Sequence, residues 1–136
     1  MIYFNYETDF ELGNEDVLAN WINATILEEG CKEGEINYIF CDDEYLHKLN
    51  VEFLNHDTLT DVISFDYTVG KELHGDIYIS VERVKDNAND FKTDFVDEVN
   101  RVIIHGVLHY CGYKDKTDSD AQIMRNKEDY YLSKLN

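Results

Sequence analysis

The residues best suited to chemistry are two histidines, His105 and His109, in the run His-Gly-Val-Leu-His, followed by Asp115. Because four residues make slightly more than one helical turn, both imidazoles project from one face of a helix and can bind one metal ion. Gly112 predicts a left-handed turn that ends this helix and returns Asp115 to the ion. Two histidines and one carboxylate leave one zinc position open for water, which is typical of a catalytic site.

Glu98 and Arg101 share the predicted helical face with the two histidines, while the remaining faces are mostly apolar. A polar stripe on a buried helix must face a cavity, a ligand or hydrogen-bonding partners. Glu98 is therefore a candidate catalytic residue, which accepts a proton or orients a ligand imidazole. The alternative is an ion pair between Glu98 and Arg101, three residues apart on the helix.

Two other interpretations of the histidine pair stay open. His105 and His109 can be hydrogen-bonded core histidines without a metal. Their spacing, with the glycine and carboxylate that follow, also equals that of the metzincin proteases. Those proteases need glutamate directly after the first histidine as the general base, and this chain has Gly106 there. The sequence therefore argues against peptide hydrolysis.

Acidic residues dominate the composition: 29 Asp and Glu against 12 Lys and Arg give a net charge of −17. Such a field repels nucleic-acid backbones at long range, so we expect no DNA partner and only local contact with RNA. No stretch approaches the roughly 20 apolar residues of a membrane span, so no membrane association is expected. The absence of an export signal at the start and three widely spaced cysteines predict a cytoplasmic protein with reduced thiols.

One α+β domain over residues 1–136 is the simplest organisation, because the chain has no proline, repeat or flexible linker. Apolar patterning predicts a small mixed sheet of about four strands with about five helices packed against it. The metal site lies at the end of a buried helix. The predicted strands are 2–6, 36–40, 62–65 and 77–80, the last two forming an antiparallel hairpin, and the predicted helices are 14–29, 42–53, 81–90, 94–111 and 119–134.

The run from His105 to Asp115 resembles the H-G-x-L-H-x-x-G-Y-x-H signature of the YbeY family, bacterial endoribonucleases of ribosomal RNA maturation. Further segments, in the same order, are similar to that family's L-N, T-D-V-L-S-F and G-D-I motifs. The resemblance covers about residues 36–115. The similar segments are Leu49-Asn50, Thr60-Asp61-Val62-Ile63-Ser64-Phe65 and Gly75-Asp76-Ile77.

The resemblance implies a YbeY-like metal-dependent hydrolase, in which one zinc ion is held by His105, His109 and Asp115. It implies a single-strand-specific endoribonuclease of rRNA processing, ribosome assembly and quality control. Its partners would be ribosomal RNA or its precursors and ribosomal proteins. The third ligand is usually histidine in the family, and the negative charge of an aspartate would leave the ion less electrophilic.

A second departure concerns the arginine that the family usually carries after L-N, because this chain has Leu54 there. An arginine at that place suits a phosphate and its developing charge, which leucine cannot bind. Arg101 is then a candidate catalytic residue that replaces it. The other candidates are Lys71, Lys114 and Lys116.

Asp61 and Ser64 are candidate substrate-binding residues, because the resemblance places their segment beside the groove. Alternation along this strand also turns Ser64 away from one core. Thr60 and Asp61 can equally be turn residues that open a strand. A function of another class stays open as well: a zinc-containing ribosome-assembly factor that binds without cutting. The leucine at position 54 and the acidic surface favour that alternative.

Overall fold

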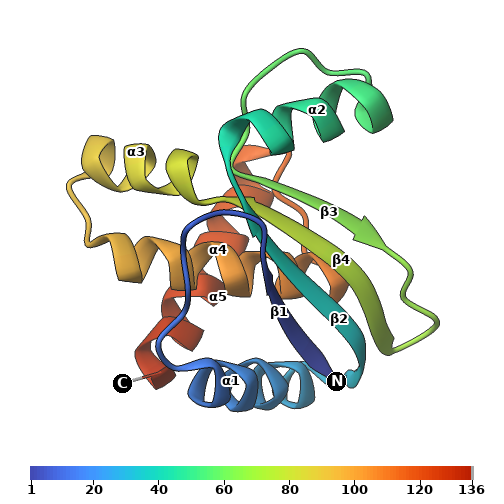
Figure 1. The fold of residues 1–136 in the computed structure, drawn as a ribbon. Helices are drawn as coiled ribbons and strands as arrows, with labels where there is room; N and C mark the ends of the chain where they lie inside the picture. The colour runs from blue at the N-terminus through green and yellow to red at the C-terminus, as the bar shows by residue number, and fades with distance from the viewer. Residues whose placement is uncertain (136) are drawn as a thin grey trace.

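The computed structural model describes residues 1–135, and Asn136, the last residue of the predicted domain, lies outside this range. Within it, four strands form one mixed sheet in the order β1-β2-β4-β3, with β3 antiparallel to β4 and the other pairs parallel. Helices pack on both faces of this sheet (Figure 1). The elements are β1 Ile2–Tyr6, α1 Glu15–Glu28, β2 Lys32–Cys41, α2 Asp43–Leu54, β3 Val62–Asp66, β4 Glu72–Ser80, α3 Val81–Phe91, α4 Phe95–Tyr110 and α5 Asp118–Leu135.

This architecture confirms the predicted α+β class, and the antiparallel pairing of β3 with β4 confirms the predicted hairpin. The largest differences are in β2 and β4, which begin at Lys32 and Glu72 rather than at 36 and 77. Their first residues pair with each other before a shift in register between Glu33 and Ile36. Charged residues and glycines at these positions give no apolar alternation, so the pattern underestimates both strands.

The main core lies between one face of the sheet and helices α1, α4 and α5, and α2 covers the opposite face through Leu46. Successive strand residues point to opposite faces. On β3, Ile63 therefore packs in the α2 cluster, while Val62 packs on the main core and Ser64 lines the cavity beside α4. The strand residues that are fully buried in the main core are Ile36, Tyr38, Phe40, Leu73, Ile77 and Ile79.

Helix α4, which carries both histidines, passes behind the sheet in Figure 1 and is buried along most of its length. Asp94 caps its first turn by accepting a hydrogen bond from the backbone N–H of Val96. In the middle of the helix, a Cβ on Gly106 would lie 2.8 Å from Cδ1 of Ile77 in β4. The missing side chain at position 106 therefore lets the site helix pack closely on the sheet.

Tyr110 anchors the last turn of α4 to the β3–β4 hairpin. Its hydroxyl lies 3.0 Å from the carbonyl oxygen of Phe65 and 3.2 Å from that of Asp76. Burial raises the pKa of Tyr110, so the hydroxyl keeps the proton that it donates. A Cβ on Gly75 would collide with this hydroxyl, and this explains the glycine of the Gly75-Asp76-Ile77 segment.

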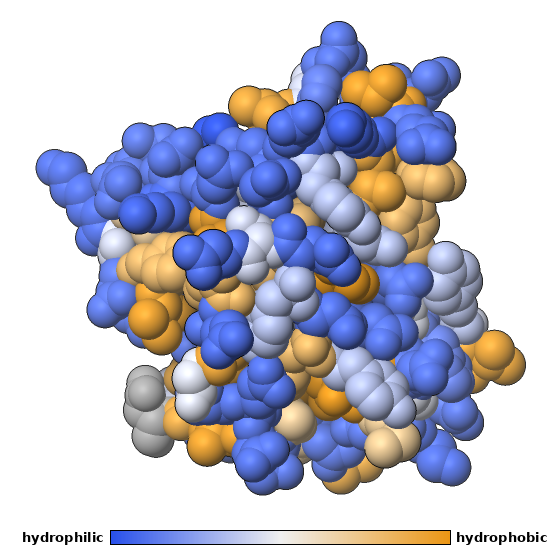
Figure 2. Space-filling view, viewed as in Figure 1, coloured by the Kyte–Doolittle hydropathy of each residue, from blue (hydrophilic) through white to orange (hydrophobic). Residues whose placement is uncertain are grey.

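The molecular surface is largely hydrophilic on the face shown in Figure 2, where apolar residues form separate small patches. Within residues 1–135, no helix combines the length and the apolar character that crossing a membrane requires.

Candidate metal centre

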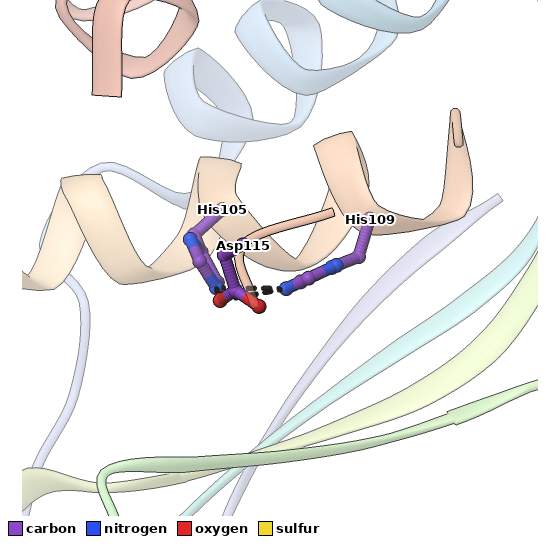
Figure 3. Close-up of side chains that lie close together, drawn as sticks. All are labelled: His105, His109 and Asp115. Carbon is purple, nitrogen blue, oxygen red and sulfur yellow. Dashed lines mark hydrogen bonds and ion pairs between the residues drawn. The ribbon is translucent and has the colours of Figure 1, made fainter. Parts of the chain in front are cut away.

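Three side chains converge at the C-terminal half of α4, as Figure 3 shows: His105 and His109 from the helix and Asp115 from the loop that follows it. The Nε2 atoms of the two histidines are 3.0 Å apart. Oδ2 of Asp115 lies 3.3 Å from each of them. The structure therefore brings together the three residues that the sequence spacing predicted to be ligands.

The loop reaches the helix through a tight turn at Gly112, whose φ is 108°, a backbone angle that other residues resist. The N–H of Gly112 donates to the carbonyl oxygen of His109, and the N–H of Tyr113 donates to that of Leu108. This pair of bonds is a Schellman motif, which ends a helix and reverses the chain. The predicted left-handed glycine is confirmed, and it explains how Asp115 comes back to the two imidazoles.

The opposite nitrogen of each imidazole is already engaged. Nδ1 of His105 is 2.6 Å from Oε2 of Glu128, and Nδ1 of His109 is 2.9 Å from the backbone carbonyl oxygen of Tyr113. Since these oxygens only accept, both Nδ1 atoms carry the hydrogen, and both Nε2 atoms present lone pairs to the centre. Such carboxylate and carbonyl partners are the usual support of metal-binding histidines.

The geometry fits a divalent cation. Two imidazole Nε2 atoms and the carboxylate of Asp115 face one another, and a cation at their centre would satisfy all three groups. Ligand bonds of about 2.0–2.1 Å in a tetrahedral zinc site place ligand atoms about 3.3 Å apart. The separations of 3.0 to 3.3 Å between these atoms are close to this value. Zinc is therefore compatible with these residues.

Arg101 does not pair with Glu98, and that predicted alternative is wrong. Its guanidinium instead donates to Oε1 of Glu128 at 2.9 Å and to Oδ1 of Asp129 at 2.6 Å, both on α5. The long arginine side chain reaches the neighbouring helix, where two carboxylates offer better charge compensation than one. Arg101 therefore holds Glu128, which in turn holds His105.

Glu128 is a site residue that the sequence analysis missed. It is 5% exposed, and it bridges Arg101 and His105. A signal exists in the sequence, because Met124, Glu128 and Tyr131 lie on one helical stripe that is buried. A carboxylate on an otherwise apolar stripe needs partners, which indicates a polar cluster on the facing helix. Burial opposes protonation of His105, but Glu128 raises the pKa of this imidazole through a hydrogen bond and its charge.

Glu98 faces the same space without a partner. It is 8% exposed, and its Oε2 atom has no hydrogen-bond partner among the described residues. Burial raises the pKa of this carboxyl, against the opposing charges of Arg101 and Arg125. Glu98 is therefore not the residue that orients either ligand imidazole, because Glu128 and Tyr113 do so. It is a carboxyl whose proton affinity is increased beside the candidate centre.

A cavity of about 580 Å³ opens beside the three converging side chains. Asp61 and Ser64, the predicted substrate-binding residues, lie in its wall on the β3 side, and Glu98 and Arg101 lie in its wall on the α4 side. Arg125 of α5, which the sequence analysis did not consider, completes the wall. The alternative cations proposed from the sequence, Lys71, Lys114 and Lys116, are not among the lining residues, and neither is Leu54.

Two imidazoles and a carboxylate that meet at the wall of an open cavity are typical of metal-dependent hydrolases. Comparison with known proteins identifies the family. A family model described as Endoribonuclease YbeY matches residues 4–136, and the chain belongs to the YbeY family.

Named relatives and a solved structure agree with this assignment. A protein named Endoribonuclease YbeY from Flavobacterium johnsoniae is 67% identical over 129 residues, which are 95% of this chain and 93% of the relative. A protein of the same name from Flavobacterium psychrophilum is 65% identical, over 97% of this chain and 94% of the relative. The solution structure of TM1509 from Thermotoga maritima is similar with a TM-score of 0.73 and 27% identity, and it covers 99% of this chain and 89% of that one.

Proposed function

We propose that this protein is a zinc-dependent endoribonuclease that cleaves single-stranded segments of ribosomal RNA precursors. The observation that carries the proposal is the convergence of His105, His109 and Asp115 on one point at the wall of a 580 Å³ cavity. The family of the chain, and the relatives named Endoribonuclease YbeY, supply the substrate class. A bound zinc ion would polarise the phosphate and make water a stronger nucleophile near neutral pH.

The protein residues prepare this chemistry by position and charge. Glu128 and the carbonyl of Tyr113 fix the two imidazoles in the tautomer that leaves Nε2 free. Arg101, engaged by Glu128 and Asp129, acts as a positioning residue. Ser64 and Asp61 line the opposite wall, where they can exchange hydrogen bonds with ribose hydroxyls and base edges of single-stranded RNA.

Glu98 is the proposed proton acceptor. Its buried Oε2 has no partner among the described residues, and burial raises its pKa, which makes the carboxylate a stronger base. The other three carboxyls of the cavity wall differ: Glu128 is held by Arg101 and His105, Asp115 by the two histidines, and Asp61 is only partly buried.

Ribosome assembly in the cytoplasm is the proposed setting, with precursor rRNA and ribosomal proteins as partners. Cys31, Cys41 and Cys111 are free thiols, which suits a reducing compartment. The acidic balance of the chain, −17, favours binding through local contacts in the cavity over general attraction to RNA.

The second candidate is a zinc-containing assembly factor that binds RNA without cutting it. Leu54 favours this candidate, because the side chain is 41% exposed at the end of α2, is not part of the cavity wall and cannot bind phosphate. A protease is disfavoured, because Gly106 stands where a metzincin has its general base and an added Cβ there would already lie 2.8 Å from Ile77.

The test compares the wild-type protein with His109→Ala and with His56→Ala, a control whose exposed imidazole makes no ion pair or side-chain hydrogen bond within residues 1–135. Each protein is analysed for bound metal and incubated with precursor rRNA and with casein. We expect the wild type and His56→Ala to hold one equivalent of zinc and to cut RNA, and His109→Ala to do neither. RNA cleavage by His109→Ala would refute the metal centre, and RNA binding without cleavage by the wild type would favour the assembly factor.

A further inference from the structure

An RNA phosphate in the cavity would be stabilised by a positive charge, but carboxylates outnumber guanidiniums in the cavity wall. Its carboxylates are Asp61, Glu98, Asp115 and Glu128, and its guanidiniums are those of Arg101 and Arg125. A phosphodiester that approaches the candidate metal centre therefore meets several negative groups. Besides a bound metal ion, a cationic side chain whose charge is not already compensated would favour binding there.

Two of the three arginines of the chain are engaged by carboxylates. Arg101 pairs with Glu128 and Asp129 at 2.9 and 2.6 Å. Arg83 pairs with Asp43 and Asp86 at 2.9 and 3.4 Å, at the junction of α2 and α3. Neither guanidinium can turn to an RNA phosphate without breaking two ion pairs.

Arg125 differs from both. It extends from the first half of α5, is exposed, and makes no ion pair with another residue of the described part of the chain. It lines the cavity that contains His105 and Asp115. Its charge is also felt by Glu98, the nearly buried carboxyl whose Oε2 atom lacks a hydrogen-bond partner. The cavity wall therefore holds both a guanidinium without an ion pair, Arg125, and a carboxyl with an unpartnered oxygen, Glu98.

A second hollow, of about 430 Å³, shares Arg125, Glu98 and Arg101 with the cavity. Each space is lined by four carboxyl groups and two arginines, so charge alone does not separate them. The cavity differs because its wall also holds Ser64 and the three residues of the candidate metal centre. A phosphate that contacts Arg125 from the cavity is therefore in the same space as that centre.

We propose that Arg125 is the phosphate-binding residue of the cavity, which takes up an RNA phosphodiester beside the His105–His109–Asp115 cluster and supplies the cation that Leu54 cannot. This inference rests on the proposed function for its substrate class. The planar guanidinium can donate two parallel hydrogen bonds to one phosphate, which an ammonium group cannot do.

The experiment measures binding and cleavage separately in Arg125→Ala, Arg125→Lys and the control Lys85→Ala. Lys85 is exposed on α3 and outside the cavity wall, so its variant removes one positive charge without touching the site. Binding of a fluorescent single-stranded 2′-O-methyl RNA oligonucleotide, confirmed by gel to stay uncut, is followed by anisotropy over a range of salt concentrations. Cleavage of unmodified RNA gives kcat and KM, and zinc content and the urea midpoint are recorded for every variant.

We expect Arg125→Ala to bind the oligonucleotide about 10- to 100-fold more weakly, the range for a lost hydrogen bond to a charged group. The slope of log affinity against log salt should fall by about 0.7, the value for one phosphate contact on a single strand. Arg125→Lys should keep the slope but lose part of the affinity. Lys85→Ala should match the wild type, and no variant should change zinc content or the urea midpoint.

Failure of this inference is distinct from failure of the proposed function. If Arg125→Ala binds and cuts RNA as Lys85→Ala does, or if the wild type does not bind the oligonucleotide, the inference is overturned. If the wild type binds the oligonucleotide and loses binding in Arg125→Ala but cuts no RNA, the inference stands and the nuclease proposal is refuted.

Discussion

Nδ1 of His105 lies 2.6 Å from Oε2 of Glu128, a residue 23 positions later on another helix. This contact fixes the imidazole in the tautomer and orientation that a metal ion needs. Replacing Glu128 by Gln should therefore weaken zinc binding about 10- to 100-fold, the usual cost of losing such a support. Asp129→Asn is the matched control, since Asp129 contacts Arg101 and not His105. Competition with a chromogenic chelator measures both, and equal affinities would show that Glu128 does not support the ligand.

Glu29 should stabilise the protein in a pH-dependent way. It accepts hydrogen bonds from the hydroxyls of Tyr113, at 2.7 Å, and Tyr131, and from Lys127 at 3.2 Å. Burial alone would raise the pKa of Glu29, but these donors hold it below its ordinary value of 4.5. A carboxyl with a lowered pKa contributes stability above its unfolded pKa, and this contribution disappears as the pH falls through the folded value.

Glu29→Gln should therefore lower the free energy of unfolding at pH 7 by about 1–3 kcal/mol. The deficit should shrink as the pH is lowered below 4.5. Glu28→Gln is the control, because Glu28 makes only a loose contact of 3.8 Å with Lys134. Urea unfolding at several pH values measures the difference, and a deficit that grows toward acid pH would contradict a lowered pKa at Glu29.

Gly75→Ala should destabilise the fold by about 1–3 kcal/mol, the usual cost of overpacking. The added Cβ would collide with the hydroxyl of Tyr110 and approach the backbone oxygen of Phe65 to 2.6 Å, and the backbone cannot give way cheaply. Gly13→Ala is the control, because a Cβ there meets nothing within 4 Å. Chemical unfolding compares the two, and equal midpoints would mean that Tyr110 does not anchor α4 to the hairpin.

Two of the three cysteines should be slow to react with thiol reagents in the folded state. Burial raises the pKa of Cys41 to about 12, and burial together with the neighbouring Cys31 raises that of Cys111. At pH 8 almost no reactive thiolate is then present at either position. Alkylation followed by peptide mapping should find Cys41 and Cys111 labelled only after unfolding in guanidinium. Rapid labelling of either thiol in the native protein would contradict its raised pKa.

The candidate centre was largely predictable from the sequence because it is built from short-range geometry. His105 and His109 share a helical face by spacing alone, and Gly112 is suited to the turn that returns Asp115 to them. The residues around the centre were harder to predict from the sequence. Glu128 and Arg125 reach the cavity only because α5 packs against α4, and the pattern of α5 alone does not say which helix it faces.

The incorrect Glu98–Arg101 pair shows the same limit. Residues three apart on a helix can pair, but the pairing contributes only a few tenths of a kcal/mol. Tertiary partners on α5 easily outweigh it, since Arg101 meets two carboxylates there. For the fold, apolar alternation predicted the central residues of each strand. It did not predict the charged first residues of β2 and β4.

The place of Asp115 between two exposed lysines, Lys114 and Lys116, has a practical consequence. An ion bound by Asp115 would tie this segment to α4 more strongly than the contacts of Asp115 with the two histidines alone. Trypsin cuts after lysine and needs a locally opened chain. Limited digestion at this segment therefore reports on metal occupancy in the natural sequence, without any label or substitution.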